Sequence, residues 1–344
     1  MRSIKLTALR RMQLLDVPRP ALTQPTDVLI RVGCVGVCGS DVHYYTTGRI
    51  GSQVVQYPFA AGHEFSGTVV ETGAEVRNLR PGDRVAVDPA MPCFTCDQCR
   101  GGRSHTCRSL RFLGCPGQAE GCLCDYMVMP ATSCIVLPAA YSMEQGALLE
   151  PLSIGAYAAR LGGDLRGKRI AILGCGPIGL SVLLAARQAG AARMYVSDPI
   201  AARRAFARQC GATWDGAPAE DLVATILRHE PLALDVVFEC CGQQEAMDQG
   251  VELLQPGGRL VLLGIPEVAR VSFSIDLLRR RELVIQNVRR QNECMEAAVE
   301  LLHAFPALAT DMITHRFPAE QTQAAFDLVA AYQDDVIKAM IHFE

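Results

Sequence analysis

The sequence has no strong excess of charge of either sign, and this excludes several kinds of partner. Lysine and arginine together number 33 and aspartate and glutamate 36, which gives a formal net charge of -3. Such a balance offers no broad electrostatic footprint for nucleic acid or for an anionic membrane. A short basic run at 279–281 indicates a solvated helix edge or a subunit contact. We therefore expect a small neutral or polar ligand, with neither nucleic acid nor a membrane as partner.

Long hydrophobic segments are missing as well. The longest apolar run without a charge, residues 170–186, is interrupted by glycine and proline, whereas a membrane-spanning helix needs about 20 apolar residues. Basic residues at positions 2, 5, 10 and 11 break up the apolar core that a secretory signal peptide would need. Together these features predict a cytoplasmic protein.

Cysteine is too scarce for a scaffold held together by disulfides. The chain has 15 cysteines in 344 residues, whereas disulfide scaffolds hold roughly 8–10% cysteine. In a reducing cytosol, clustered cysteines more often bind a metal or act in catalysis than form disulfides. Hydrophobic residues make up 49% of the chain, and at about 150 residues per domain its length predicts two globular domains.

The residue pattern changes near position 150. Before it, short β-branched runs at 27–32, 67–71 and 83–88 are separated by loops rich in glycine and proline, which predicts a β-rich domain. From 151 to 285, apolar strands alternate with alanine-rich amphipathic segments. This alternation predicts βαβ units and a parallel sheet.

The tail of the chain predicts a return to the first domain. Beyond residue 285 the pattern predicts two helices and a closing strand, at 292–303, 319–332 and 336–343. We therefore predict an α/β protein in which residues 1–150 and 286–344 form a β-rich catalytic domain. Residues 151–285 are predicted to form a central, doubly wound domain inserted into it.

A glycine-rich turn joins one predicted strand to the next helix. Residues 169–179 end in G-x-G-x-x-G. In such a turn Gly174 allows a tight bend, Gly176 allows close approach of a pyrophosphate, and Gly179 allows the helix to pack closely on the strand. The pattern predicts a dinucleotide site, and the alternative is a turn that serves helix packing alone.

An acidic residue lies at the end of the next predicted strand. Asp198 is 19 residues beyond Gly179, where a carboxylate accepts hydrogen bonds from the adenosine ribose and repels a 2′-phosphate. NAD is therefore predicted rather than NADP, although Arg203 and Arg204 nearby leave NADP open. Turns after the later strands are further candidates for cofactor contacts or plain structural turns: residues 240–242, Leu263, Gly264, Ile265, Asn287, Val288 and Arg289.

Four cysteines lie close together in a loop rich in glycine and proline. Their spacing is C-x2-C-x2-C-x7-C, formed by Cys93, Cys96, Cys99 and Cys107. Four thiolates complete a tetrahedral shell around zinc and leave no open position, so the spacing predicts a structural zinc site. An iron–sulfur cluster and four unrelated thiols are the alternatives.

A second set of metal-ligating residue types is dispersed over the first 150 residues. Its members are Cys38, His63, Glu64 and Glu150. One thiolate, one imidazole and one carboxylate would hold zinc and leave a fourth position open, as catalytic zinc sites do. Asp41 would orient His63, while Ser40 and His43 would carry a proton outward. The alternatives are a cysteine that packs as a small apolar residue, and polar groups that only satisfy their neighbours.

These features, in this order over nearly the whole chain, resemble the zinc-dependent medium-chain dehydrogenase/reductase superfamily and, within it, the sorbitol (L-iditol 2-) dehydrogenase family. The strings that carry the resemblance are Cys38-Gly-Ser-Asp-Val-His-Tyr-Tyr, Gly48-Arg-Ile-Gly51, Gly62-His-Glu, Pro81-Gly-Asp-Arg-Val, Glu150-Pro-Leu-Ser, Gly174-Cys-Gly-Pro-Ile-Gly179 and Thr314-His-Arg-Phe-Pro318. The resemblance implies a GroES-like catalytic domain around a central Rossmann domain. It also implies NAD, one catalytic and one structural zinc per chain, and assembly into dimers or tetramers.

The resemblance assigns roles to individual residues. It implies that the catalytic zinc is held by Cys38, His63 and Glu64, with Glu150 near the metal, where it contacts water or substrate. Alcohol dehydrogenases of the superfamily often have a zinc-ligating cysteine at the position of Glu150, so the choice between Glu64 and Glu150 as direct ligand stays open.

Substrate and cofactor contacts are also implied by the resemblance. It implies that a polyol contacts Tyr44, Glu150 and Arg289. It implies that NAD contacts Ile178, Asp198 and Arg203. Sorbitol dehydrogenases commonly have tyrosine where this chain has Arg290, which affects the pattern of hydroxyls recognised. Animal members lack the full four-cysteine lobe, so the chain resembles microbial members more closely.

The whole pattern predicts an NAD-dependent enzyme that oxidises a secondary hydroxyl of a sorbitol-, xylitol- or L-iditol-type polyol to a ketose. Hydride would pass to the nicotinamide ring, and Ser40, His43 or Glu150 would move the proton. One alternative is a threonine, butanediol or simple secondary-alcohol dehydrogenase of the same superfamily. Another, from a different class, is a thiol sensor that binds zinc and a nucleotide without turnover.

Overall fold

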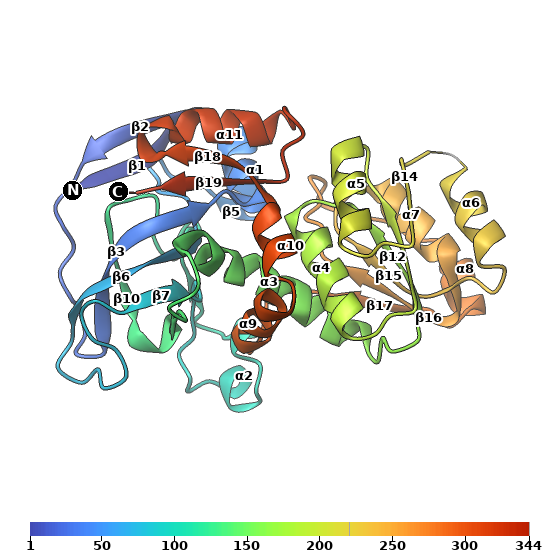
Figure 1. Cartoon of the computed structure of the whole chain (residues 1–344), viewed down its shortest axis with the longest axis horizontal. Helices are drawn as coiled ribbons and strands as arrows, with labels where there is room; N and C mark the ends of the chain where they lie inside the picture. The colour runs from blue at the N-terminus through green and yellow to red at the C-terminus, as the bar shows by residue number, and fades with distance from the viewer. Residues whose placement is uncertain (220, 344) are drawn as a thin grey trace. The chain divides into compact units, whose positions relative to one another are not determined.

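The protein consists of two compact units. The structure, a computed structural model, describes residues 1–219 and 221–343. Positions 220 and 344, which fall within the predicted domain ranges, lie outside this description. One unit comprises Met1–Glu150 and Ala309–Glu344, and the other comprises Pro151–Leu308 (Figure 1). The long helix α3 (Met143–Gly162) carries the chain from the first unit to the second.

The returning segment begins later than the sequence predicts. Residues 286–308, expected in the catalytic domain, belong to the second unit. Strand β17 (Val284–Asn287) pairs with the neighbouring parallel strand, and helix α9 (Met295–Ala304) packs against helix α4 (Pro177–Gln188). The chain therefore completes the parallel sheet and adds a helix to this unit before it returns.

The first unit is built around a seven-stranded sheet to which both chain ends contribute. In sheet order its strands are β11 (Cys134–Val136), β7 (Arg84–Val87), β6 (Glu64–Thr72), β3 (Asp27–Gly36), β19 (Lys338–His342) and β18 (Ile313–Pro318), with β10 (Tyr126–Pro130) also pairing with β3. Strand β19 runs antiparallel to β3, with Ile341 opposite Val35. The tail therefore shares this sheet with the N-terminal segment.

Shorter elements surround this sheet. They include three two-stranded antiparallel sheets, β1 (Arg2–Ala8) with β2 (Arg11–Asp16), β4 (Arg49–Ile50) with β5 (Gln53–Val54), and β8 (Ala90–Met91) with β9 (Arg111–Phe112). The helices are α1 (Gly39–Thr47), α2 (Asp97–Arg100) and α11 (Thr322–Ala330), with single turns η1 (Ser104–Thr106), η2 (Ala131–Ser133) and η3 (Ala319–Gln321). Helix α10 (Pro306–Asp311) contains the boundary at which the chain passes back from the second unit. Helix α11 packs on both α1 and β19, which ties the tail to the helix that carries Cys38 and Tyr44 (Figure 1).

The second unit contains a six-stranded sheet that is parallel throughout. In sheet order its strands are β14 (Trp214–Gly216), β13 (Arg193–Ser197), β12 (Arg169–Leu173), β15 (Leu234–Glu239), β16 (Leu254–Leu262) and β17. The remaining helices of this unit are α5 (Ala201–Gln209), α6 (Leu222–His229), α7 (Gln244–Leu253) and α8 (Ile275–Arg280). The sheet order is that of a doubly wound dinucleotide-binding fold, and the predicted α/β class is confirmed.

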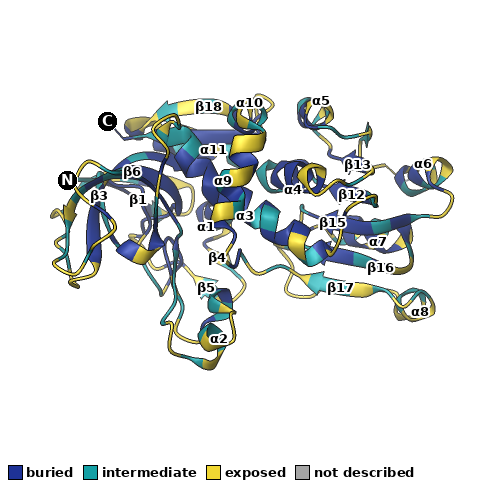
Figure 2. Cartoon of the chain, turned by 60° about the horizontal axis from the view of Figure 1, so that its bottom comes forward, coloured by how far each residue is buried: buried dark blue, intermediate teal, exposed yellow. Residues whose placement is uncertain are grey.

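Burial explains why the strands of the second unit read as continuous apolar runs. Residues 170–173 of β12 are all buried, as is most of β15 (Figure 2). A parallel sheet is covered by helices on both faces, so its strands show no polar alternation. Within the described ranges, none of the helices combines the length and apolar character needed to cross a bilayer.

Candidate active site

Helix α1 begins at a predicted zinc ligand. Cys38 is the N-cap of α1 and follows β3 with an extended backbone. The Ser40 hydroxyl donates a hydrogen bond to Cys38 Sγ at 3.3 Å. Cysteine sulfur is a zinc ligand, so this position at the start of α1 suits the predicted role of Cys38. His43, three residues after Ser40, lies on the same side of α1.

Three of the predicted zinc ligands are brought together. One ligand atom each from Cys38, His63 and Glu64 lie within 4.8 Å of one another, although 25 residues separate Cys38 from His63 in the sequence. Thiolate, imidazole and carboxylate are all zinc ligands, and three protein ligands leave a fourth position open. This donor set fits a catalytic zinc ion.

Asp41 lies behind His63. Its Oδ1 accepts a hydrogen bond from the Gly62 backbone N–H at 3.1 Å and lies 3.4 Å from His63 Nδ1, a charge contact rather than an aligned hydrogen bond. Burial opposes protonation of His63, but the charges of Asp41 and Cys38 outweigh it and raise its pKa above the ordinary value. A carboxylate at Nδ1 fixes the ring so that Nε2 faces a metal, which is the role predicted for Asp41.

Glu150 is buried close to this group but is not one of the three gathered residues. Burial raises the pKa of Glu150 to about 8, an effect that the charge of His63 opposes and the charge of Glu64 increases. Among the residues that the structure describes, the ligand atoms that lie within 4.8 Å of one another at this site are those of Cys38, His63 and Glu64. The geometry therefore favours Glu64 over Glu150 as the third ligand.

Lys338 is a buried partner of this site that sequence reasoning missed. It lies on β19, is 1% exposed, forms an ion pair with Glu64 Oε2 and donates to the Val37 carbonyl at 3.0 Å. A fully buried lysine is rare unless it is paired. A lysine within the apolar run 336–343 therefore indicates a buried ion pair, but the sequence does not indicate which acidic residue is its partner.

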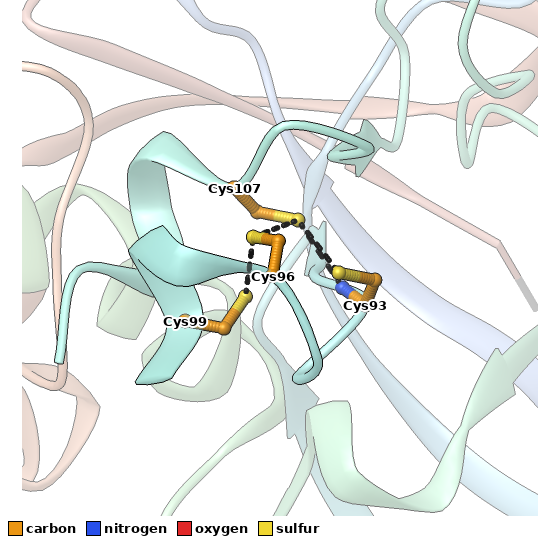
Figure 3. Close-up of side chains that lie close together, drawn as sticks. All are labelled: Cys93, Cys96, Cys99 and Cys107. Atoms are coloured by element: carbon orange, nitrogen blue, oxygen red, sulfur yellow. Dashed lines mark hydrogen bonds between the residues drawn. The ribbon is translucent and has the colours of Figure 1, made fainter. Parts of the chain in front are cut away.

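The four-cysteine lobe forms a second compact ligand set (Figure 3). Sulfur–sulfur distances are 3.6 Å for Cys96 and Cys99, 3.9 Å for Cys96 and Cys107, and 3.5 Å for Cys107 and Cys93. Disulfide sulfurs lie about 2.05 Å apart, and all four cysteines are free. Four converging thiols from one loop fit a tetrahedral structural zinc ion.

The glycine-rich turn of the second unit has the predicted local geometry. Gly174 has a φ of +101°, Gly176 is the N-cap of α4, and a Cβ on Gly179 would overlap the Gly174 carbonyl oxygen. Ile178 lies in the first turn of α4. The turn and the N-terminus of α4 therefore have the glycine geometry that a pyrophosphate site requires.

Asp198 is held against this turn. Its Oδ2 accepts a hydrogen bond from the Cys175 N–H and its Oδ1 from the Ile200 N–H, both at 2.8 Å. Arg204 donates to the Asp198 backbone carbonyl at 2.6 Å, while the Arg203 guanidinium lies near Gly176. The carboxylate is thus held against the glycine-rich turn, with two arginine side chains close by.

The later turns also gather at the carboxyl edge of this sheet. Strands β15, β16 and β17 end at Glu239, Leu262 and Asn287. A Cβ on Gly264 would overlap the Gly242 backbone, so the turns 240–242 and 263–265 are in contact, and Val288 N donates to Leu262 O at 2.9 Å. Ligands of doubly wound sheets bind at this edge, so Leu263, Ile265, Val288 and Arg289 lie where cofactor contacts were predicted.

Comparisons with known proteins agree with this geometry. Residues 24–139 match the alcohol dehydrogenase GroES-like domain, and residues 177–304 match the zinc-binding dehydrogenase family. Sorbitol dehydrogenase from Homo sapiens is 36% identical over 331 residues, covering 92% of this chain and 88% of the relative. The chain belongs to the sorbitol dehydrogenase family of zinc-dependent medium-chain dehydrogenases.

Solved structures of the superfamily have the same fold. An oxidoreductase of unknown specificity from Escherichia coli is 31% identical, with a TM-score of 0.93 and coverage of 100% of this chain and 99% of that one. A zinc-binding dehydrogenase from Sinorhizobium meliloti, bound to NADP, is 30% identical with a TM-score of 0.88 over 99% of both chains. The protein is a zinc-dependent oxidoreductase of this superfamily that uses a nicotinamide dinucleotide.

Most cysteines outside the two ligand sets are buried, as predicted, but two are not. The buried ones are Cys34, Cys115, Cys122, Cys124, Cys134, Cys175, Cys210 and Cys294. Cys240 is half-buried and Cys241 is exposed. Both lie in the turn after β15, where Glu239 Oε1 accepts hydrogen bonds from the Cys241 and Gly242 N–H groups. The sequence indicates that a turn follows this strand, but not that Cys240 is half-buried and Cys241 exposed within it.

Replacing Cys99 by serine is expected to remove the lobe zinc alone. A hydroxyl is a poor zinc ligand at neutral pH, so zinc affinity at this site should fall by roughly 100-fold or more. Zinc content per chain should drop by one equivalent, and amide exchange should rise within residues 93–107. Cys134→Ser, a buried cysteine on β11, is the matched control. Full zinc content in Cys99→Ser would rule out zinc ligation by this residue.

Replacing Gly179 by alanine is expected to weaken both folding and cofactor binding. The added Cβ overlaps the Gly174 carbonyl oxygen, so helix α4 must move away from the turn. Overpacking of this kind costs about 1–3 kcal/mol in the free energy of unfolding. Urea denaturation measures that loss, and titration of NADH fluorescence measures binding, which should weaken about 10-fold. Unchanged NADH affinity would show that the turn is not the pyrophosphate site.

Proposed function

We propose that this protein is an NAD-dependent polyol dehydrogenase that oxidises a secondary hydroxyl of a sorbitol-, xylitol- or L-iditol-type substrate to a ketose. The observation that carries the proposal is the convergence of Cys38, His63 and Glu64, a three-ligand set, in a chain of the sorbitol dehydrogenase family. The overall reaction converts alcohol and NAD⁺ to ketone, NADH and a proton.

The chain's own groups then have defined tasks. When bound, zinc would lower the pKa of the substrate hydroxyl, and NAD would accept the hydride. Asp41 holds the His63 ring in place. Ser40 and His43, on one side of α1, would move the released proton toward solvent, and Glu150 is the alternative proton carrier. Tyr44 and Arg289 would bind further hydroxyls of the polyol.

The preference for NAD over NADP rests on Asp198. A fixed carboxylate at the ribose accepts hydrogen bonds from both hydroxyls and repels a 2′-phosphate. The NADP in the Sinorhizobium meliloti structure, together with Arg203 and Arg204 beside Asp198, supports NADP as the second candidate. The ratio of kcat/KM for the two cofactors decides between them.

A second candidate substrate class is a diol or simple secondary alcohol. A 2R,3R-butanediol dehydrogenase from Bacillus subtilis is 27% identical, with a TM-score of 0.90 over 100% of this chain. The test is NADH formation by zinc-loaded protein on sorbitol, xylitol, L-iditol, ribitol, 2,3-butanediol, 2-butanol and threonine. We expect the highest kcat/KM on a polyol. Turnover of 2,3-butanediol or threonine without any polyol would replace the proposal with the second class, and NADH binding without any turnover would favour a sensor.

We also propose a homo-oligomer in the cytoplasm. Strand β17 lies at one end of the parallel sheet, and the apolar Val284 on it is 41% exposed. An exposed edge of this kind pairs readily with another chain. The two thiolate ligand sets require a reducing compartment. Sedimentation velocity is expected to give a dimer or tetramer, and a monomer at micromolar concentration would contradict this.

A further inference from the structure

A short chain of polar contacts runs through the interior of the first unit beside Tyr44. Tyr44, on α1, is 4% exposed and donates its hydroxyl proton to Gln53 Oε1 at 3.3 Å. Gln53, on β5, donates from Nε2 to Cys115 Sγ at 2.7 Å. The Tyr44 hydroxyl also lies 4.0 Å from the same sulfur. Three residues from three separate segments therefore meet at one point.

This contact chain lies beside the predicted zinc ligands. Helix α1 carries both Cys38, at its N-cap, and Tyr44, less than two turns later. The loop that carries Cys115 packs against His63, since the Phe112 and His63 rings lie 5.5 Å apart and a Cβ on Gly114 would come within 2.6 Å of the Gly62 carbonyl. Two of the three segments that form the polar chain, α1 and the loop that carries Cys115, thus also contact or carry predicted metal ligands.

Cys115 also lines a surface depression. This concavity has a volume of about 430 Å³ and is lined by residues 56–59 and 115–120. Phe59, one of its lining residues, packs edge-on against the Tyr44 ring with centroids 6.1 Å apart. Cys115 therefore belongs both to the polar chain and to the lining of this concavity, and the Tyr44 ring packs against another lining residue.

We propose that Gln53 and Cys115 are specificity-determining residues that act through Tyr44. They fix the direction of the Tyr44 hydroxyl, because the tyrosine donates its proton to Gln53. The Tyr44 oxygen then accepts a hydrogen bond from a substrate hydroxyl adjacent to the reacting carbon. The ligand class is a chain with neighbouring hydroxyls, as opposed to a simple secondary alcohol. This inference rests on the proposed polyol dehydrogenase function and names the groups that would select its substrate.

The physical basis is the asymmetry of buried hydrogen bonds. A site built to bond a substrate hydroxyl discriminates against an analogue that lacks it, because the buried protein groups then lose their partner. Gln53 is well suited to this task, since one amide group both accepts from Tyr44 and donates to Cys115. An apolar residue at position 53 would leave the tyrosine hydroxyl free to rotate away from the substrate.

Two variants test the proposal. In Gln53→Leu and Cys115→Ala, KM for the best polyol is expected to rise about 10-fold, the effect of one hydrogen bond, with a smaller change in kcat. The ratio of kcat/KM for the polyol to that for 2-butanol should fall by a similar factor. Cys115→Ser keeps an acceptor at this position and should restore most of the wild-type KM. Cys134→Ala, a buried cysteine on β11, is the matched control and should leave the ratio unchanged.

The outcomes separate this inference from the proposed function. If the wild-type enzyme oxidises polyols and both variants keep its KM, Gln53 and Cys115 do not determine specificity. If both variants lose activity equally on polyol and 2-butanol, and Cys115→Ser does not rescue, their role is structural and the inference is again wrong. If the wild-type enzyme oxidises no polyol, the proposed function fails and this inference fails with it.

Discussion

Replacing Cys38 by serine is expected to lower dehydrogenase activity by about 1000-fold or more, while the protein stays folded and still binds NADH. Cys38 supplies the single thiolate among the three gathered ligand atoms. A neutral hydroxyl binds zinc poorly, so the metal is lost and with it the charge stabilisation that metal catalysis supplies. Steady-state rates on the best substrate of the panel give the size of the loss.

Zinc content separates this effect from a general defect. Cys38→Ser should lose one equivalent of zinc and keep the equivalent bound by the four-cysteine lobe, and Cys99→Ser should show the converse. Cys134→Ser, which removes a buried thiol of the same unit outside both ligand sets, should keep both equivalents and full activity. Activity within tenfold of wild type in Cys38→Ser would show that Cys38 is not a ligand of a catalytic metal.

The parallel sheet could be predicted from the sequence because its signals are local. The glycine-rich turn is predicted between a strand and a helix, and it lies between β12 and α4. Strands buried on both faces are continuous apolar runs, and the glycines of a dinucleotide turn are required by backbone geometry within six residues. Such features need no knowledge of distant parts of the chain.

The surroundings of the metal ligands could not be predicted in the same way. Lys338 pairs with Glu64 across 274 residues, and Gln53 meets Cys115 across 62. Both contacts depend on which strands are neighbours, since β19 must pair with β3 before Lys338 can reach Glu64. Residue spacing indicates which residues are metal ligands, but the order of strands in the sheet determines which other side chains contact those ligands.

The boundary at which the chain returns to the first unit also depends on tertiary contacts that the sequence pattern does not specify. The sequence places the end of the central domain at residue 285, where the last apolar run of the βαβ series stops. Strand β17 and helix α9 nevertheless belong to the second unit, which ends at Leu308. An amphipathic helix such as 295–304 packs equally well on either domain by its pattern alone. Its packing against α4 is a tertiary contact, which the hydrophobic periodicity of the sequence does not predict.

Replacing Asp198 by alanine is expected to shift the preference for NAD over NADP by about 1000-fold. The carboxylate would give up its bonds to two ribose hydroxyls, each a charge-assisted hydrogen bond, so kcat/KM for NAD should fall about 100-fold. Loss of the negative charge also leaves Arg203 and Arg204 to attract a 2′-phosphate, so kcat/KM for NADP should rise about 10-fold.

The design of this experiment must separate cofactor recognition from loop structure, because Asp198 also accepts hydrogen bonds from Cys175 N–H and Ile200 N–H. Collapse of the loop would weaken both cofactors alike, whereas loss of ribose recognition weakens NAD and strengthens NADP. Asp248→Ala removes an exposed carboxylate from helix α7 of the same unit and is the matched control, for which the cofactor ratio should stay near that of wild type. Equal losses on NAD and NADP in Asp198→Ala would assign Asp198 to the loop alone and leave NAD specificity without a structural basis.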